Sequence, residues 1–211
     1  MKKLFLLPLA ACLLVACPGP VDNGEGGGGG GTGKTPVVFN YDAIKDALEG
    51  HLTDESQSTY IQNEHSYTVG GLAFAARGGK YFGRVTNQYG GSEGYYALKS
   101  LQIKKAGGDV VTVTGLDGYT TITVVNLTTY TDNTIDKFLG IKVAGAAVTA
   151  NETTLTAVAT GQENIGSGDN AGKTFPVYRV TVTYTIAADA TRFVMTAPAN
   201  NAAYVESYTI A

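Results

Sequence analysis

Apolar and polar residues alternate along most of the chain, and Gly, Asn and Asp interrupt the alternation at short intervals. The clearest run is Tyr178 to Ile186, where Tyr, Val or Ile fills every second position and Arg or Thr lies between. Period two is the pattern of a strand with one buried face. Residues Gly118 to Tyr130 predict a second strand, with Ile122 and Val124 on its buried face and a bulge near Val125.

Shorter segments rich in Thr, Val, Tyr and Ile predict more strands. They lie at residues 67–76, 80–87, 95–104, 109–114, 138–148, 153–160, 191–197 and 203–210. Gly107-Gly108-Asp109 and Leu116-Asp117-Gly118 have the composition of hairpin turns. Many short strands with tight connections predict antiparallel pairing, in a β-sandwich or, as the alternative, a small closed β-barrel. We favour the sandwich.

One short helix is expected before the first of these strands. Asp42 is a suitable cap, and Ile44, Ala47 and Leu48 share one face at helical spacing, with Gly50 fitting the helix end. Residues 37–211 are therefore expected to form a single mainly β domain. A chain of this length buries close to 70% of the surface that its unfolded form exposes.

The chain begins with a different pattern. Lys2 and Lys3 precede an apolar run from Leu4 to Ala16, which is too short for the roughly 20 residues that span a bilayer. A basic start, a short apolar run and small residues at its end are typical of a secretory signal. The run closes with Leu14-Val15-Ala16-Cys17, which resembles the lipobox of bacterial lipoproteins at every position.

The resemblance covers residues 1–17 and has consequences for location. It implies that residues 1–16 are a signal peptide, that the peptidase cuts between Ala16 and Cys17, and that lipid joins the Cys17 sulfur. Two or three acyl chains on one residue would hold the protein on a membrane, because one chain alone binds marginally. Pro18, rather than Asp, follows the cysteine, so the resemblance implies the outer membrane if the source is Gram-negative. Whether the domain faces the periplasm or the cell surface is left open.

Residues 17–36 are expected to form the lipidated cysteine and a flexible tether, since Gly26 to Gly31 are all glycine. Its root-mean-square reach is roughly 24 Å. Gly28 to Thr35 matches the letters of a phosphate-binding loop, but no buried strand precedes it and Pro36 opposes the helix that should follow. A near match at Gly168 to Thr174 is one residue short, and we interpret it as a turn.

The composition disfavours some classes of function. The two cysteines are Cys12, which would leave with the signal peptide, and Cys17, which would carry lipid, so neither a disulfide nor thiol chemistry is expected in the domain. The formal net charge is −3 without a basic cluster, so nucleic acid is not an expected partner. No motif calls for a cofactor or metal.

Candidate chemical groups are few, and each has a plainer interpretation. His51 and His65, with Asp54 and Glu64, match no metal spacing, and Ser66 beside His65 lacks a nucleophile elbow. Two loops are rich in the oxygen ligands that calcium prefers, and we interpret both as ordinary turns. Their residues are Glu163, Asn164, Asp169 and Asn170 in one loop, and Asp132, Asn133 and Asp136 in the other.

Tyrosines are the remaining candidates for recognition. They are Tyr81, Tyr89, Tyr95, Tyr96, Tyr119 and Tyr130, of which those at 89–96 lie among glycines. The absence of tryptophan disfavours a carbohydrate platform. The leading hypothesis is a non-enzymatic envelope lipoprotein that binds a partner or fills a structural role. The alternatives are a small lipid-anchored hydrolase with a dispersed site and a subunit of an envelope assembly.

The lipobox interpretation makes a direct prediction. Cys17→Ala should abolish lipid incorporation and move the protein from the membrane fraction to the soluble fraction, because the acyl chains supply the anchor. Metabolic labelling with an alkyne fatty acid and phase partition in detergent measure both effects. Cys12→Ala is the matched control and should remain labelled; a labelled Cys17→Ala protein would contradict the lipobox.

Overall fold

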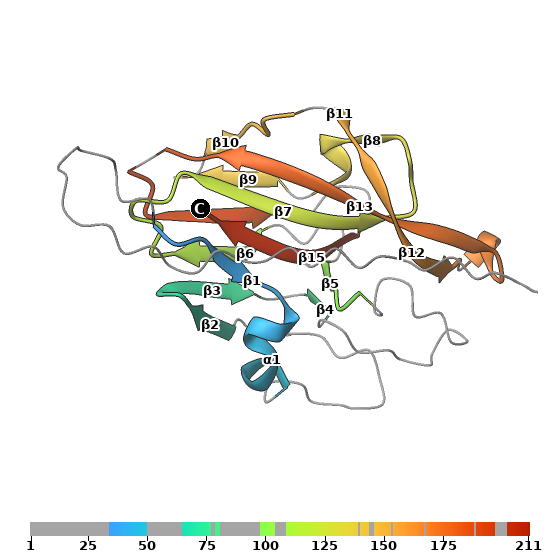
Figure 1. Ribbon diagram of the computed structural model, residues 1–211, viewed down its shortest axis with the longest axis horizontal. Coiled ribbons are helices and arrows are strands. Elements are labelled where there is room, and N and C mark those ends of the chain that lie inside the picture. Colours follow the sequence, from blue (N-terminus) through green and yellow to red (C-terminus); the bar gives the residue numbers. More distant parts are fainter. Residues whose placement is uncertain are drawn as a thin grey trace, which may run out of the picture. The chain divides into compact units, whose positions relative to one another are not determined.

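Two antiparallel sheets form the fold of the computed structural model (Figure 1). It describes residues 34–49, 65–76, 79–80, 98–103, 109–138, 140–143, 146–152, 154–166, 168–187, 189–196 and 202–211. All of them belong to one compact unit, Gly33–Ala211.

The first sheet runs in the order β12-β13-β7-β15-β5-β4, and β1 also pairs with β15. Its strands are β12 (Ala157–Ile165), β13 (Thr174–Thr185), β7 (Thr121–Thr128), β15 (Ala203–Ile210), β5 (Leu101–Ile103), β4 (Gly79–Lys80) and β1 (Val37–Phe39). The second sheet runs in the order β10-β9-β14-β6-β3-β2. Its strands are β10 (Ala146–Val148), β9 (Gly140–Val143), β14 (Arg192–Thr196), β6 (Asp109–Thr114), β3 (Leu72–Ala76) and β2 (His65–Val69).

Smaller elements complete the described part of the chain. A short ladder joins β11 (Thr154–Leu155) to β8 (Asn133–Thr134). Helix α1 (Tyr41–Glu49) follows β1, and two 3-10 turns lie at Ile135–Lys137 and Gly168–Asn170.

The core lies between the two sheets. Along β7 and β13, the even-numbered positions from Ile122 to Val124 and from Val180 to Tyr184 are buried, as period two requires. Phe74 from the opposite sheet stacks on Phe39 at 4.7 Å between ring centroids and tilts against Tyr208 at 5.2 Å. One hydrophobic cluster therefore includes both inner faces, which is the sandwich predicted from the sequence and not the closed barrel.

Several predicted strands match the structure. Residues 109–114 and 203–210 are β6 and β15, and the alternating run Tyr178 to Ile186 lies largely in β13, which starts earlier, at Thr174. Residues 81–87, 95–97 and 104 lie outside the described residues, as do Gly107 and Gly108. The described remainder of 95–104 includes all of β5. Strand β1 was not expected, because three residues are too few to show a period.

Four sequence expectations need correction, and each has a local reason. Residues 67–76 are not one strand but the hairpin β2–β3, which turns at Gly70 and Gly71, both with positive φ. Residues 138–148 likewise divide into β9 and β10. Leu116-Asp117-Gly118 is not a hairpin turn, because it links β6 in one sheet to β7 in the other. The extra residue of the bulge is Glu206 on β15, across from Val125.

The short helix is confirmed, with a different cap. The backbone N–H of Ala43 donates to Asn40 Oδ1 at 3.0 Å, so Asn40 caps α1 and Asp42 lies in its first turn. Ile44 is buried. The side chains of Ala47 and Leu48, and residue Gly50, are outside the described set.

Both ends of the described chain meet at one end of the sandwich. Val37 in β1 pairs with Ile210 in β15, and the carbonyl of Ala211 accepts from the N–H groups of Thr120 and Thr121. Beside them, the Lys34 ammonium lies over the Tyr119 ring at 4.8 Å. Strand β7 starts here and runs to the opposite end (Figure 1).

The core contains a tyrosine hydroxyl whose burial lowers the stability of the fold. Tyr208 is fully buried, and its O–H has no hydrogen-bond partner within the described residues. Burial raises the pKa of Tyr67 to about 12 and also raises the pKa values of Tyr184 and Tyr208. Unfolded phenols ionise near pH 10, so above about pH 10 the unfolded chain releases protons that the folded chain keeps. The free energy of unfolding should therefore fall as the pH rises from about 10 to 12.

Tyr208→Phe should raise the free energy of unfolding at pH 7 by about 1 kcal/mol, because it removes an unsatisfied buried group. It should also reduce the loss of stability above about pH 10. Urea unfolding at pH 7 and pH 11 measures both effects. The exposed Tyr130, changed to Phe, is the control and should alter neither value. A destabilised Tyr208→Phe protein would mean that the hydroxyl is satisfied.

Candidate functional site

An open groove lies at the end of the sandwich opposite to β1 and the C-terminus, with a volume of about 930 Å³. Its walls come from the end of β7 and the loop that follows, the start of β15, and the tip of the β12–β13 hairpin, which extends beyond the sheet in Figure 1. The lining residues are Leu127, Thr128, Thr129, Tyr130, Lys137, Phe138, Asn164, Ile165, Gly166, Asn170, Phe175, Ala202, Ala203 and Tyr204.

The groove continues a small apolar cluster on the outer face of the first sheet. Leu127 and Val177 occupy odd-numbered positions and so point away from the main core, yet both are buried. Leu98 and Tyr204 pack against them. The outer faces of a sandwich are usually polar, and this small buried apolar cluster is an exception beside the groove.

The hairpin tip holds one wall in place. The N–H of Gly166 donates to the Lys173 carbonyl at 2.8 Å, and the N–H of Lys173 donates to the Asn170 carbonyl at 3.1 Å. The Lys173 ammonium donates to Asn170 Oδ1 at 3.2 Å. Gly166 has no space for a side chain, because a Cβ would lie 2.4 Å from the Asn170 carbonyl oxygen and 2.8 Å from the Phe175 ring. These contacts fix Asn170 and Phe175 relative to each other.

A bulge positions this hairpin on the sheet. Between Ala159 and Glu163, β12 has two more residues than β13 does opposite them. Thr160 Oγ1 donates to the Val177 carbonyl at 2.6 Å and accepts from the Gln162 N–H at 3.1 Å. Gly161 adopts φ +79°, which is the left-handed region that favours glycine. Bulges increase strand twist, and this one lies where the hairpin leaves the sheet.

The loop after β7 forms the opposite wall. The Tyr130 side chain is 58% exposed, and its backbone is held on both sides. Its N–H donates to Thr128 Oγ1 at 3.2 Å, and its carbonyl accepts from Asn133 Nδ2 at 2.7 Å. Lys137 lies over the Tyr130 ring at 5.3 Å and donates to the Asp132 carbonyl. An aromatic ring with a fixed backbone is a preorganised contact surface.

The described lining of the groove is nearly uncharged. Of the lining residues that the structure describes, Lys137 is the one with a charge, and none is a carboxylate. On the outer face of β13 and β15, Arg179 is paired with Glu206 through two bonds of 2.6 and 2.7 Å. The hydrogen bond to Glu206 raises the pKa of Arg179, so this pair is satisfied internally. The groove is therefore suited to an uncharged ligand that has both apolar and hydrogen-bonding surfaces.

The oxygen-rich loops do not gather metal ligands. Asn164 and Asn170 both line the groove, while Asp169 is exposed in the 3-10 turn and Glu163 is exposed on β12. In the other loop, Asn133 Nδ2 is bound to Tyr130, and Asp136 accepts from the Thr134 hydroxyl. Within the described part of the chain, no group of three or more His, Cys, Asp or Glu is placed to hold a metal ion.

The structure gives little support to the candidate histidine and tyrosine sites considered from the sequence. His65 and Ser66 are neighbours on β2 and so face opposite sides of the second sheet. His51, Asp54 and Glu64 lie outside the described residues. The same is true of Tyr81, Tyr89, Tyr95 and Tyr96. Tyr119 is buried at the β1 end of the sandwich, so Tyr130 is the described candidate tyrosine that lines the groove.

Neither glycine-rich near match forms a phosphate-binding loop in the described residues. Residues 28–33 lie outside them, and Lys34 and Thr35 lead into strand β1 rather than a helix. The second match, at Gly168 to Thr174, is a 3-10 turn at the hairpin tip, as predicted.

Sequence reasoning missed Phe138, Phe175 and Tyr204 as lining residues. Phe175 precedes Pro176 in a strand position where β13 pairs only with β12, which explains how proline is tolerated there. A Phe-Pro step at the base of a polar turn was the available signal. No local pattern links it to Tyr204, which comes from the last strand.

Comparisons of the chain with protein-family models, characterised proteins and solved structures gave no significant match. Among the described residues, no helix has the length and apolar character needed to cross a membrane.

The hairpin geometry makes a prediction about the groove. Gly166→Ala should displace the Asn170 carbonyl and the Phe175 ring, because the new methyl group overlaps both. Amide hydrogen exchange should accelerate within residues 163–176 and stay unchanged in β6 and β14. Gly172→Ala is the matched control: it lies at φ +82° in open space, so it adds backbone strain without a clash. Equal exchange in both variants would show that the Gly166 contact does not position the wall.

Proposed function

We propose that this chain is a cell-envelope lipoprotein, held on a membrane through lipid on Cys17, whose β-sandwich is a non-enzymatic binding module. The groove at the end of the sandwich is the proposed binding site. The single observation that carries the proposal is its composition: partly exposed aromatic rings and side-chain amides line one open groove of about 930 Å³, and Lys137 is the single charge among the described lining residues.

The position of the groove supports this role. The described chain starts at Lys34, next to β1, and the tether precedes it. The groove lies at the far end of β7, and eight strand residues span roughly 26 Å at 3.3 Å each. The tether is attached at the β1 end of the domain, so its attachment point does not block the groove at the far end. The groove would then meet partners in solution or on another structure.

The hydrolase alternative has no comparable support. Its proposed residues were His51 or His65 with a carboxylate or a serine. His65 and Ser66 are on opposite faces of β2, and His51 lies outside the described residues. A binding role needs only the groove.

The proposal predicts where a partner makes contact in cells. A photo-crosslinking amino acid at Tyr130, which is exposed in the groove, should give a discrete adduct in intact cells. The same amino acid at Asp117, which is exposed in the turn near Lys34, should give none. Cys17→Ala should weaken the Tyr130 adduct if the partner lies in the envelope. Equal adducts at both positions, or none at either, would count against the groove as the binding site.

A further inference from the structure

The charge of the groove limits its ligand. Among its described lining residues there is one lysine and no carboxylate, and that lysine is already engaged by the Asp132 carbonyl and the Tyr130 ring. A ligand with several charges would lose hydration in the groove without gaining partners. The matching ligand is therefore uncharged overall.

The main-chain groups beside the groove are largely used. Asn164 pairs with Phe175 across β12 and β13, and Leu127 pairs with Tyr204 across β7 and β15. In the loop, the N–H and carbonyl of Tyr130 are bound to Thr128 and Asn133. A peptide that binds as an added strand needs a free row of backbone groups. The outer edge of β12 is the place in the first sheet where such a row lies beside the groove, so extended peptides are the competing ligand in the test below.

Side-chain amides supply polar contacts inside the groove. Asn164 uses Nδ2 to donate to the Ile165 carbonyl, and Asn170 uses Oδ1 to accept from Lys173. Within the described residues, Asn164 keeps its Oδ1 acceptor and Asn170 keeps its Nδ2 donors. A ligand with hydroxyl groups satisfies both, because each hydroxyl donates and accepts.

The apolar surfaces are flat rings. Phe175 and Tyr204 are partly exposed, and Tyr130 is largely exposed, in the same groove. Sugar rings present flat C–H faces that pack on aromatic faces, with hydroxyls around their edges. Tyrosine and phenylalanine provide such faces in a chain without tryptophan. The volume of about 930 Å³ is near the upper end of the roughly 300–1,000 Å³ usual for ligand pockets, which leaves room for more than one ring.

We infer that the groove binds an uncharged oligosaccharide, packed on Phe175 and Tyr204 and hydrogen-bonded by Asn164 and Asn170. This inference rests on the proposed function, since it names the ligand class of the same groove.

The test uses the full-length lipidated protein in a polyoxyethylene detergent, because sugar-based detergents would compete. The protein is applied to immobilised neutral gluco-, galacto- and manno-oligosaccharides, to acidic oligosaccharides, and to a set of extended peptides. Binding to at least one neutral oligosaccharide is expected. Phe175→Ala and Asn170→Ala should each weaken it about tenfold. Val158→Ala, an exposed position on β12 outside the groove, should bind like the wild type.

Each outcome decides a separate claim. Asn170 is exposed, so Asn170→Ala should keep the fold if Phe175→Ala does not, and thermal unfolding checks both. No binding to any neutral oligosaccharide, or binding that survives both substitutions, overturns the sugar inference. Peptide binding that both substitutions abolish overturns it too, but leaves the groove as a binding site. The proposed function fails separately, if crosslinking at Tyr130 also gives no adduct.

Discussion

The fold depends on the pairing of the last strand with strands from the rest of the chain. Strand β15 pairs with β7 along most of its length, with β5 at its start and with β1 at its end. Its inward residues Val205, Tyr208 and Ile210 are fully buried. Because β15 follows all the other described strands along the chain, the first sheet is incomplete until β15 has paired with its neighbours. The same strand contributes Tyr204 to the groove, so site and core share one element.

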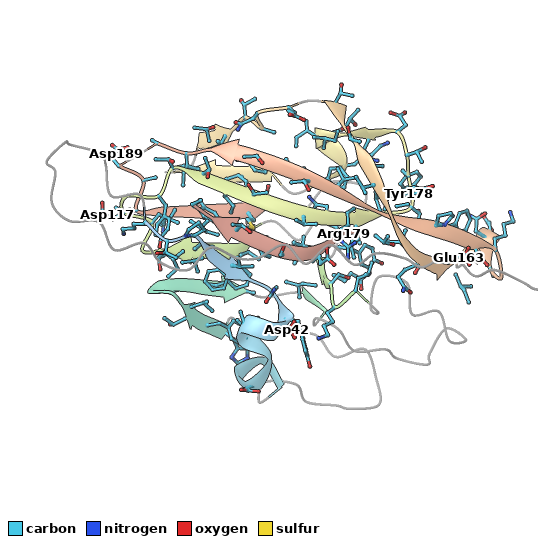
Figure 2. The ribbon with its side chains drawn as sticks, in the orientation of Figure 1. Asp42, Asp117, Glu163, Tyr178, Arg179 and Asp189 are labelled. Carbon is cyan, nitrogen blue, oxygen red and sulfur yellow. The ribbon has the colours of Figure 1, made fainter. Side chains whose placement is uncertain are left out.

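The bulge on β15 divides the strand into a part that pairs with β1 and a part that borders the groove. Glu206 is the extra residue between Val205 and Ser207, and it binds the Arg179 guanidinium on β13 across the outer face, where Figure 2 labels Arg179. Beyond the bulge towards the C-terminus, β15 packs against β1 near the tether. Before the bulge, it packs beside the groove. An ion pair this exposed contributes little stability, but its two bonds fix the bulge register.

The sequence predicted elements with a clear period and missed features that depend on long-range pairing. Val180 and Val182 could be assigned to a buried face because alternation is local. Leu116 to Gly118 could not be assigned to a link between sheets, because hairpin and crossover turns use the same residues. The groove was harder still: Tyr130 was named as a tyrosine near a strand, while Tyr204 and Phe175 meet it only through the order of strands in the sheet.

The structure changes the interpretation of Asn164 and Asn170. In sequence they lie in an oxygen-rich loop, where amide and carboxylate oxygens could attract a cation. In the fold, the two amide side chains line the groove. Glu163 and Asp169 are exposed and are not part of the described lining. The amides lie instead beside aromatic rings. A site that joins planar amides to aromatic faces discriminates by hydrogen-bond geometry rather than by charge, and its affinity should therefore depend only weakly on ionic strength.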